Sequence, residues 1–174
     1  MIYEEWRYTE HGIFLDMPCA YVHQCRTMVM EMLDQRIFPD ATQEHLLSFA
    51  IGQNGYRMAT GYQVDFNVHK TPDCGWDAPD GVDVKSTQHD PPYLKLNQAT
   101  ARRAKAKFYA LVHVVVQDEE DDLAKFMIVG WASRHELREA PVNRNGHSPF
   151  HYLLPEQLRM RSNFWEDDSD PSQA

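Results

Sequence analysis

Apolar residues recur at helical spacing near the start of the chain. Between residues 18 and 38 they recur at intervals of three, four or seven positions, at Val22, Val29, Met32, Leu33 and Ile37. This spacing puts them on one face of a helix, and Asp16 followed by Pro18 is typical of a helix start. The pattern therefore predicts a first helix that ends near residue 38.

A second helix is predicted over residues 41–60. Asp40 and Gln43 form a pair like a capping box at its beginning. Gly52 and Gly55 are expected to break or tighten it midway, because glycine inside a helix costs about 1 kcal/mol.

Alternating and continuous apolar runs predict the strands in the rest of the chain, at 61–68, 82–87, 108–117, 125–133 and 149–155. An amphipathic basic helix is predicted over 97–107, and short helices over 133–137, with Ser133 as cap, and 156–160. The order of these elements predicts an α/β fold with a mixed central β-sheet flanked by α-helices. We expect an N-terminal helical extension (1–40) packed on an α/β core (41–162), followed by an acidic disordered tail (163–174).

Charge is distributed unevenly along the 174 residues, which are enough for one domain. The net charge of −9 argues mildly against a protein that coats nucleic acid, but charge acts locally, over about 8 to 10 Å. Residues 91–117 contain no acid and carry the bases Lys95, Arg102, Arg103, Lys105 and Lys107. These bases are candidates for contacts with a nucleic-acid backbone, although a solvated helix face is the alternative.

Asp83 and Lys85, in the sequence GVDVKST, project from one face of the strand predicted at 82–87. An exposed ion pair is one explanation, and a catalytic site is the other. Three aspartates precede the strand, at Asp73, Asp77 and Asp80. Asp80 belongs to a turn with Gly81, but a hairpin near 78–80 would bring Asp73 or Asp77 across from Asp83.

Carboxylates that lie so close together repel unless a cation lies between them. Mg²⁺ suits that role, because it prefers hard oxygen ligands and takes one or two carboxylates. With Lys85 beside the ion, such a site supports hydrolysis of a phosphodiester.

The sequence PDCGWDAPDGVDVKST (72–87) resembles the catalytic hairpin of the PD-(D/E)XK nuclease superfamily, in particular its small phage and bacterial members. RRAKAKFYALVHVVV, MIVGWASRHEL and FHYLLPEQLR are similar to later segments of that family, so the resemblance covers about residues 42–160. It implies a restriction-endonuclease-like fold and a Mg²⁺-dependent DNA nuclease, with Mn²⁺ as a substitute ion. A catalytically inactive relative that binds nucleic acid or protein in a phage or repair complex is the alternative.

The resemblance also assigns residues. It implies that Asp83 is a metal ligand, that Val84 lends its carbonyl, and that Lys85 is the catalytic lysine. For the upstream ligand we assign Asp77 first, because members with G-x-D use that aspartate. Asp73 stays open, because the spacing from Asp77 to Asp83 is short for the family.

Other candidate site residues are less defined. Gln88 follows the strand and either contacts phosphate or water or satisfies the strand end. Relatives often carry a glutamate on the first core helix, where this chain has Tyr56. Glu44, one turn or more earlier, is the candidate substitute, although a first-turn glutamate commonly just complements the helix dipole.

The expected location is the cytoplasm of a bacterial or phage-infected cell. No stretch of the sequence approaches the length of a membrane span, and the acidic N-terminus lacks the order of a signal peptide. The three cysteines do not indicate a disulfide framework. DNA is the expected partner, with a homodimer as one option for the assembly.

Overall fold

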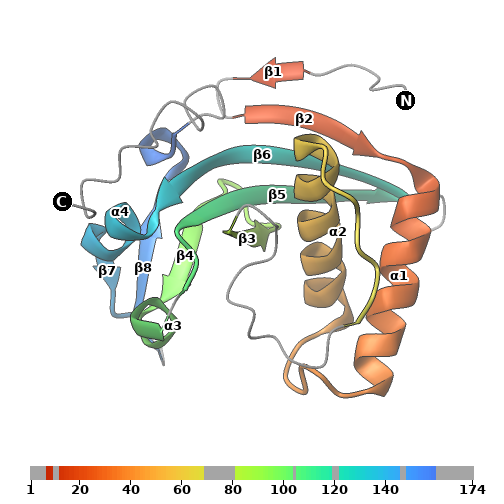
Figure 1. Ribbon diagram of the computed structural model, residues 1–174, viewed down its shortest axis with the longest axis horizontal. Helices are drawn as coiled ribbons and strands as arrows, with labels where there is room; N and C mark the ends of the chain where they lie inside the picture. The colour runs from red at the N-terminus through yellow and green to blue at the C-terminus, as the bar shows by residue number, and fades with distance from the viewer. Residues whose placement is uncertain are drawn as a thin grey trace.

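The computed structural model describes residues 7–9, 12–68, 81–103, 105–118, 122–145 and 148–159. The helices are α1 (Cys19–Asp34), α2 (Gln43–Thr60), α3 (Gln98–Arg103), α4 (Arg134–Glu139) and a 3-10 turn, η1 (Pro155–Gln157). The strands are β1 (Arg7–Thr9), β2 (Gly12–Met17), β3 (Val82–Thr87), β4 (Leu94–Asn97), β5 (Phe108–Asp118), β6 (Leu123–Ser133), β7 (Val142–Asn143) and β8 (Phe150–Leu153). This is a mixed α/β arrangement, as the sequence predicts (Figure 1).

The strands form two sheets. The larger has the order β1-β2-β6-β5-β3, in which β3 runs parallel to β5 and all other neighbours are antiparallel. The smaller is antiparallel, with the order β4-β8-β7. β3 therefore ends the described order of the larger sheet.

Each face of the larger sheet covers its own hydrophobic core. α1 and α2 pack on one face through a first core that includes Val22, Ile51, Val84, Val112 and Phe126. α3, α4 and the smaller sheet pack against the other face through a second core that includes Leu94, Ala101, Leu111, Val129 and Leu137. Figure 1 shows α1 and α2 together at one end, with α3, α4 and β8 toward the other. A residue on β3 or β5 therefore faces one core or the other, according to its place in the strand.

The N-terminal residues contribute strands that the sequence analysis does not predict. β2 pairs with β6 from Ile13↔Ile128 to Met17↔Ala124, and β1 pairs with β2. The segment 12–17, GIFLDM, is short and has three consecutive apolar residues without a clear alternation, so it gives a weak strand signal. The predicted first helix is confirmed, although it ends at Asp34 rather than near residue 38.

Helix α2 is continuous, so the predicted break at its glycines is wrong. It begins at the N-cap Thr42, whose side chain accepts a hydrogen bond from the backbone of His45. A Cβ added at Gly52 would lie 2.5 Å from the Cβ of Ser86, and one at Gly55 would lie 2.8 Å from the ring of Phe126. The glycines thus let the helix approach β3 and β6 closely.

Residues 61–68 form no strand, contrary to the prediction. The backbone N–H of Asp65 donates to the side-chain oxygen of Asn54 on α2, at 2.8 Å. Phe66 packs edge-on against Tyr21 of α1, with 5.6 Å between ring centroids. The apolar residues of this segment pack against the first core, and the segment runs back along α1 and α2 (Figure 1). Packing of one side of the segment against the helices explains why apolar and polar residues alternate in it, although it forms no strand.

The predicted basic helix over 97–107 is too long. Leu94–Asn97 pair with β8 as strand β4, and α3 covers only Gln98–Arg103. Lys105 and Lys107 lie in the link to β5, so they do not share a helix face with Arg102. Near the end of the described chain, the short helix predicted over 156–160 is instead the 3-10 turn η1.

Two predicted features lie outside the described residues. These are the hairpin that would join 72–80 to β3, and the acidic tail 163–174. None of the helices that the structure describes combines the length and the apolar character needed to cross a bilayer.

Candidate functional site

Asp83 and Lys85 lie side by side on β3. Val82 and Val84 alternate with them and are buried in the first core, so the two charged residues face the opposite side of the sheet. The ammonium Nζ of Lys85 lies 2.5 Å from Oδ1 of Asp83. The side chains are 34% and 16% exposed, respectively, so the pair is partly shielded from water. This shielding distinguishes the pair from an ordinary surface salt bridge, which contributes at most about 1 kcal/mol.

The neighbouring strand places a buried phenol beside the carboxylate. Asp83 is the register partner of Tyr109 on β5, and Lys85 is the partner of Leu111. Burial raises the pKa of Tyr109 to about 12, and the charge of Asp83 adds to this rise while Arg134 and Arg138 oppose it. The hydroxyl of Tyr109 therefore stays protonated and can act as a hydrogen-bond donor at any physiological pH.

Asp83 Oδ1 is closed to solvent. It forms no geometrically acceptable hydrogen bond with the described residues, although Lys85 Nζ lies within ion-pair distance. The Lys85 ammonium compensates the charge of this oxygen, because it lies 2.5 Å away. Among the described residues, Lys85 is therefore the cation that holds the carboxylate.

Helix α2 lies across the other face of β3. Its closest approach is at Gly52, over Ser86. Glu44 is exposed in the first turn, eight residues earlier and thus about 12 Å away along the helix axis. Tyr56 is 4% exposed and belongs to the first core. The helix therefore brings neither residue to the face that carries Asp83.

Polar residues gather at the carboxyl end of β3. Thr87 is the register partner of His113, and Gln88 follows. Burial lowers the pKa of His113, while the charge of Asp90 and a hydrogen bond with the backbone of Gln88 act in the opposite direction. His113 lies within the apolar run of β5 and is half-buried. Gln88 therefore has a structural contact at the strand end.

The upstream aspartates Asp73 and Asp77 lie outside the described residues, as does Asp80. In the part of the chain that the structure describes, no three histidine, cysteine or acidic residues gather in a way that would hold a metal ion. The second carboxylate of the site therefore stays a prediction.

The basic residues of 91–117 occupy different settings. Arg102, Lys105 and Lys107 are exposed, and the side chain of Arg103 is outside the description. The ammonium of Lys95 lies 4.2 Å from the centre of the Phe150 ring, a cation–π contact. The three exposed residues keep their charges at the surface between α3 and β5.

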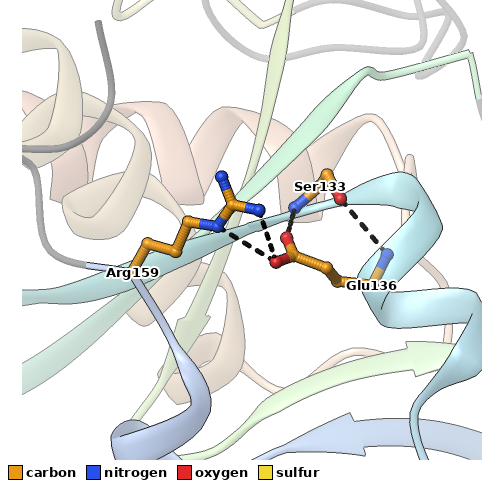
Figure 2. Close-up of polar contacts among 3 residues, drawn as sticks. All are labelled: Ser133, Glu136 and Arg159. Atoms are coloured by element: carbon orange, nitrogen blue, oxygen red, sulfur yellow. Dashed lines mark hydrogen bonds and ion pairs between the residues drawn. The ribbon is translucent and has the colours of Figure 1, made fainter. Parts of the chain in front are cut away.

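A polar cluster joins the start of α4 to Arg159, the last described residue. Ser133 and Glu136 form a reciprocal capping box, which confirms Ser133 as the cap. Arg159 donates two hydrogen bonds to Oε1 of Glu136, at 2.7 and 3.0 Å, as Figure 2 shows. The motif S-x-x-E predicts the capping box, but no sequence signal predicts Arg159, which comes 23 residues later.

Of the residues predicted from sequence, Asp83 and Lys85 are in contact, and Val84 separates them with its side chain in the first core. Tyr109 is the neighbour that sequence reasoning missed, because nothing distinguishes it from the apolar residues of its strand. No protein-family model, curated protein or solved structure matches the chain.

Proposed function

We propose that the chain is a Mg²⁺-dependent nuclease of the PD-(D/E)XK type, a hydrolase that cleaves DNA phosphodiester bonds. The observation that carries the proposal is the partly shielded Asp83–Lys85 ion pair on β3. An ion pair with only a structural role gains no stability from a shielded position, because removing two charges from water costs free energy. A metal-dependent site uses the same two groups, one as ligand and one as cation.

The residues present fit a magnesium ion. Asp83 supplies a hard carboxylate oxygen, and Mg²⁺ binds through one or two carboxylates while keeping several waters. The resemblance assigns the Val84 carbonyl and an upstream aspartate, Asp77 or Asp73, as further ligands. When bound, the ion acts as a Lewis acid that activates water and neutralises phosphate charge.

Lys85 has two tasks in this proposal. Its ammonium positions the attacking water and offsets the negative charge that develops on the phosphate. A role of Lys85 as general base is secondary in this proposal. Exposed Arg102, Lys105 and Lys107 then serve as contacts to the DNA backbone.

The order of the elements supports a restriction-endonuclease-like core. Helix α2 precedes β3, and β3 is followed by β4, by α3 and then by β5, which runs parallel to β3. Parallel neighbours need such a crossover connection. The proposed core therefore consists of α2, β3, α3, β5 and β6.

A catalytically inactive relative that binds nucleic acid or protein is the second candidate. Helix α2 favours this second candidate. Tyr56 of α2 is buried, and Glu44 lies about 12 Å along the helix axis from Gly52, where α2 comes closest to β3. If no helix residue completes the metal site, cleavage is lost while binding remains.

The test is incubation of the full chain with plasmid, linear duplex and single-stranded DNA, in Mg²⁺ or Mn²⁺ and with chelator. The proposal expects metal-dependent cleavage of at least one substrate. Binding of DNA without cleavage in either metal would favour the inactive relative.

The upstream ligand is tested by single substitutions in the same assay. Asp77→Ala should abolish cleavage, because it removes a metal-binding carboxylate. Asp80→Ala is the matched control and should leave cleavage largely intact, because the sequence assigns Asp80 to a turn with Gly81 and not to the metal site. If Asp73→Ala is inactive and Asp77→Ala is not, the ligand is Asp73.

A further inference from the structure

Tyr109 places a polar group deep in an apolar layer. It has no exposed surface, and its neighbours in the second core include Leu111 and Val129. Its hydroxyl oxygen is closed to solvent and has no hydrogen-bond partner among the described residues. A phenylalanine would fill the same space without a buried polar atom, so the hydroxyl calls for an explanation.

The charged groups around the hydroxyl indicate which group can accept a hydrogen bond from it. A buried tyrosine hydroxyl can donate a hydrogen bond, and this one has no acceptor among the described residues. The acidic group that acts on it is Asp83, its register partner on the parallel strand. The other charged groups that act on it, Arg134 and Arg138, are cations and accept no hydrogen bond.

We propose that Tyr109 is a positioning residue for Asp83: when a divalent cation takes the place of the Lys85 ammonium, the Tyr109 hydroxyl donates a hydrogen bond to the Asp83 carboxylate and holds it toward that cation. In the structure Lys85 is the group that fixes this carboxylate, through Oδ1. A metal ion that takes the place of the ammonium leaves the carboxylate to be oriented by another donor. Ligating carboxylates are commonly held by such hydrogen bonds.

This inference rests on the proposed function, and Mn²⁺ is the probe. Its affinity for the full chain is measured by water-proton relaxation in wild type, Tyr109→Phe, Asp83→Asn and Tyr152→Phe. Tyr109→Phe keeps the ring, so the core stays filled while the donor is lost. We expect its Mn²⁺ affinity to fall about 10- to 100-fold, as for other groups that orient metal ligands.

The remaining variants calibrate this result. Asp83→Asn should lose the site, and Tyr152→Phe, which removes the hydroxyl of a half-buried tyrosine on β8, should bind Mn²⁺ like wild type. Equal Mn²⁺ affinity in Tyr109→Phe and wild type would overturn the inference while leaving the metal site in place.

The same measurement separates this inference from the proposed function. Wild type that binds Mn²⁺ no better than Asp83→Asn would defeat the proposed function, and the inference would fail with it.

Discussion

At the scale of single residues, the close packing of α2 on β3 depends on Gly52, which has no side chain. Gly52 leaves room for Ser86, and an added Cβ would lie 2.5 Å from the serine Cβ. β3 carries Asp83 and Lys85, so this close contact also sets the distance between α2 and the strand that carries the candidate site.

Gly52→Ala should therefore destabilise the protein by about 1 to 3 kcal/mol, the usual cost of overpacking. Helix propensity alone predicts the opposite sign, a gain of about 1 kcal/mol. Urea unfolding of Gly52→Ala, in wild type and in a Ser86→Gly background, distinguishes the two. The serine variant should relieve much of the cost, whereas an equal loss in both backgrounds would rule out the contact as its cause.

The charged residues of the site show what a sequence pattern can and cannot predict. Period two places Asp83 and Lys85 on one face, and the structure has them in contact. The same pattern says nothing about Tyr109, because its position beside Asp83 depends on the parallel register of two strands that are 26 residues apart. Contacts of this kind depend on tertiary structure, which no local spacing contains.

At the scale of elements, the buried strands are predicted well and the half-buried segments poorly. β5 and β6 have long apolar runs, which only a strand covered on both faces needs, and both predictions are confirmed. Residues 61–68 alternate equally well, yet Asn54 supplies the partner for the Asp65 N–H that a strand would have supplied. An alternating pattern indicates that one side of a segment is buried, but it does not indicate which groups form hydrogen bonds with the backbone of the segment.

The start of α4 gives a pH-dependent prediction. Burial by itself would raise the pKa of Glu136, but hydrogen bonds from the Ser133 backbone and Arg159 outweigh it and lower the pKa below 4.5. A carboxyl group with a lowered pKa in the folded state contributes stability above its unfolded pKa, and this contribution is lost as the pH falls through the folded pKa.

The free energy of unfolding, measured against pH, tests this contribution. Glu136→Gln should be less stable than wild type near neutral pH, and the difference should narrow as the pH falls below about 4.5. Arg159→Gln should shift the acid-induced loss of stability to higher pH. A difference between Glu136→Gln and wild type that stays constant with pH would contradict the assigned contacts.

At the scale of the whole molecule, a chain of net charge −9 is proposed to bind a polyanion. The proposal is physically reasonable only if positive charge is concentrated locally, as it is in residues 91–117. Replacing Arg102, Arg103, Lys105 and Lys107 by glutamine should weaken DNA binding. It should also reduce the slope of log affinity against log salt by about 0.9 for each lost phosphate contact.

Fluorescence anisotropy at several salt concentrations measures both quantities. Lys125→Gln is the control, because Lys125 lies on β6 with its ammonium 3.7 Å from Asp16. Unchanged affinity and slope in the fourfold variant would leave these residues as ordinary solvated surface.

The central claim is that the Asp83–Lys85 pair is catalytic, and the cleavage rate of Lys85→Ala tests it most directly. The account predicts a loss of at least two orders of magnitude, or about 2.7 kcal/mol of transition-state stabilisation. DNA binding in Ca²⁺ should stay within a few-fold of wild type, and Lys85→Arg should recover only part of the rate, because it keeps the charge but changes its shape. A Lys85→Ala protein that cleaves DNA at the wild-type rate would contradict the account.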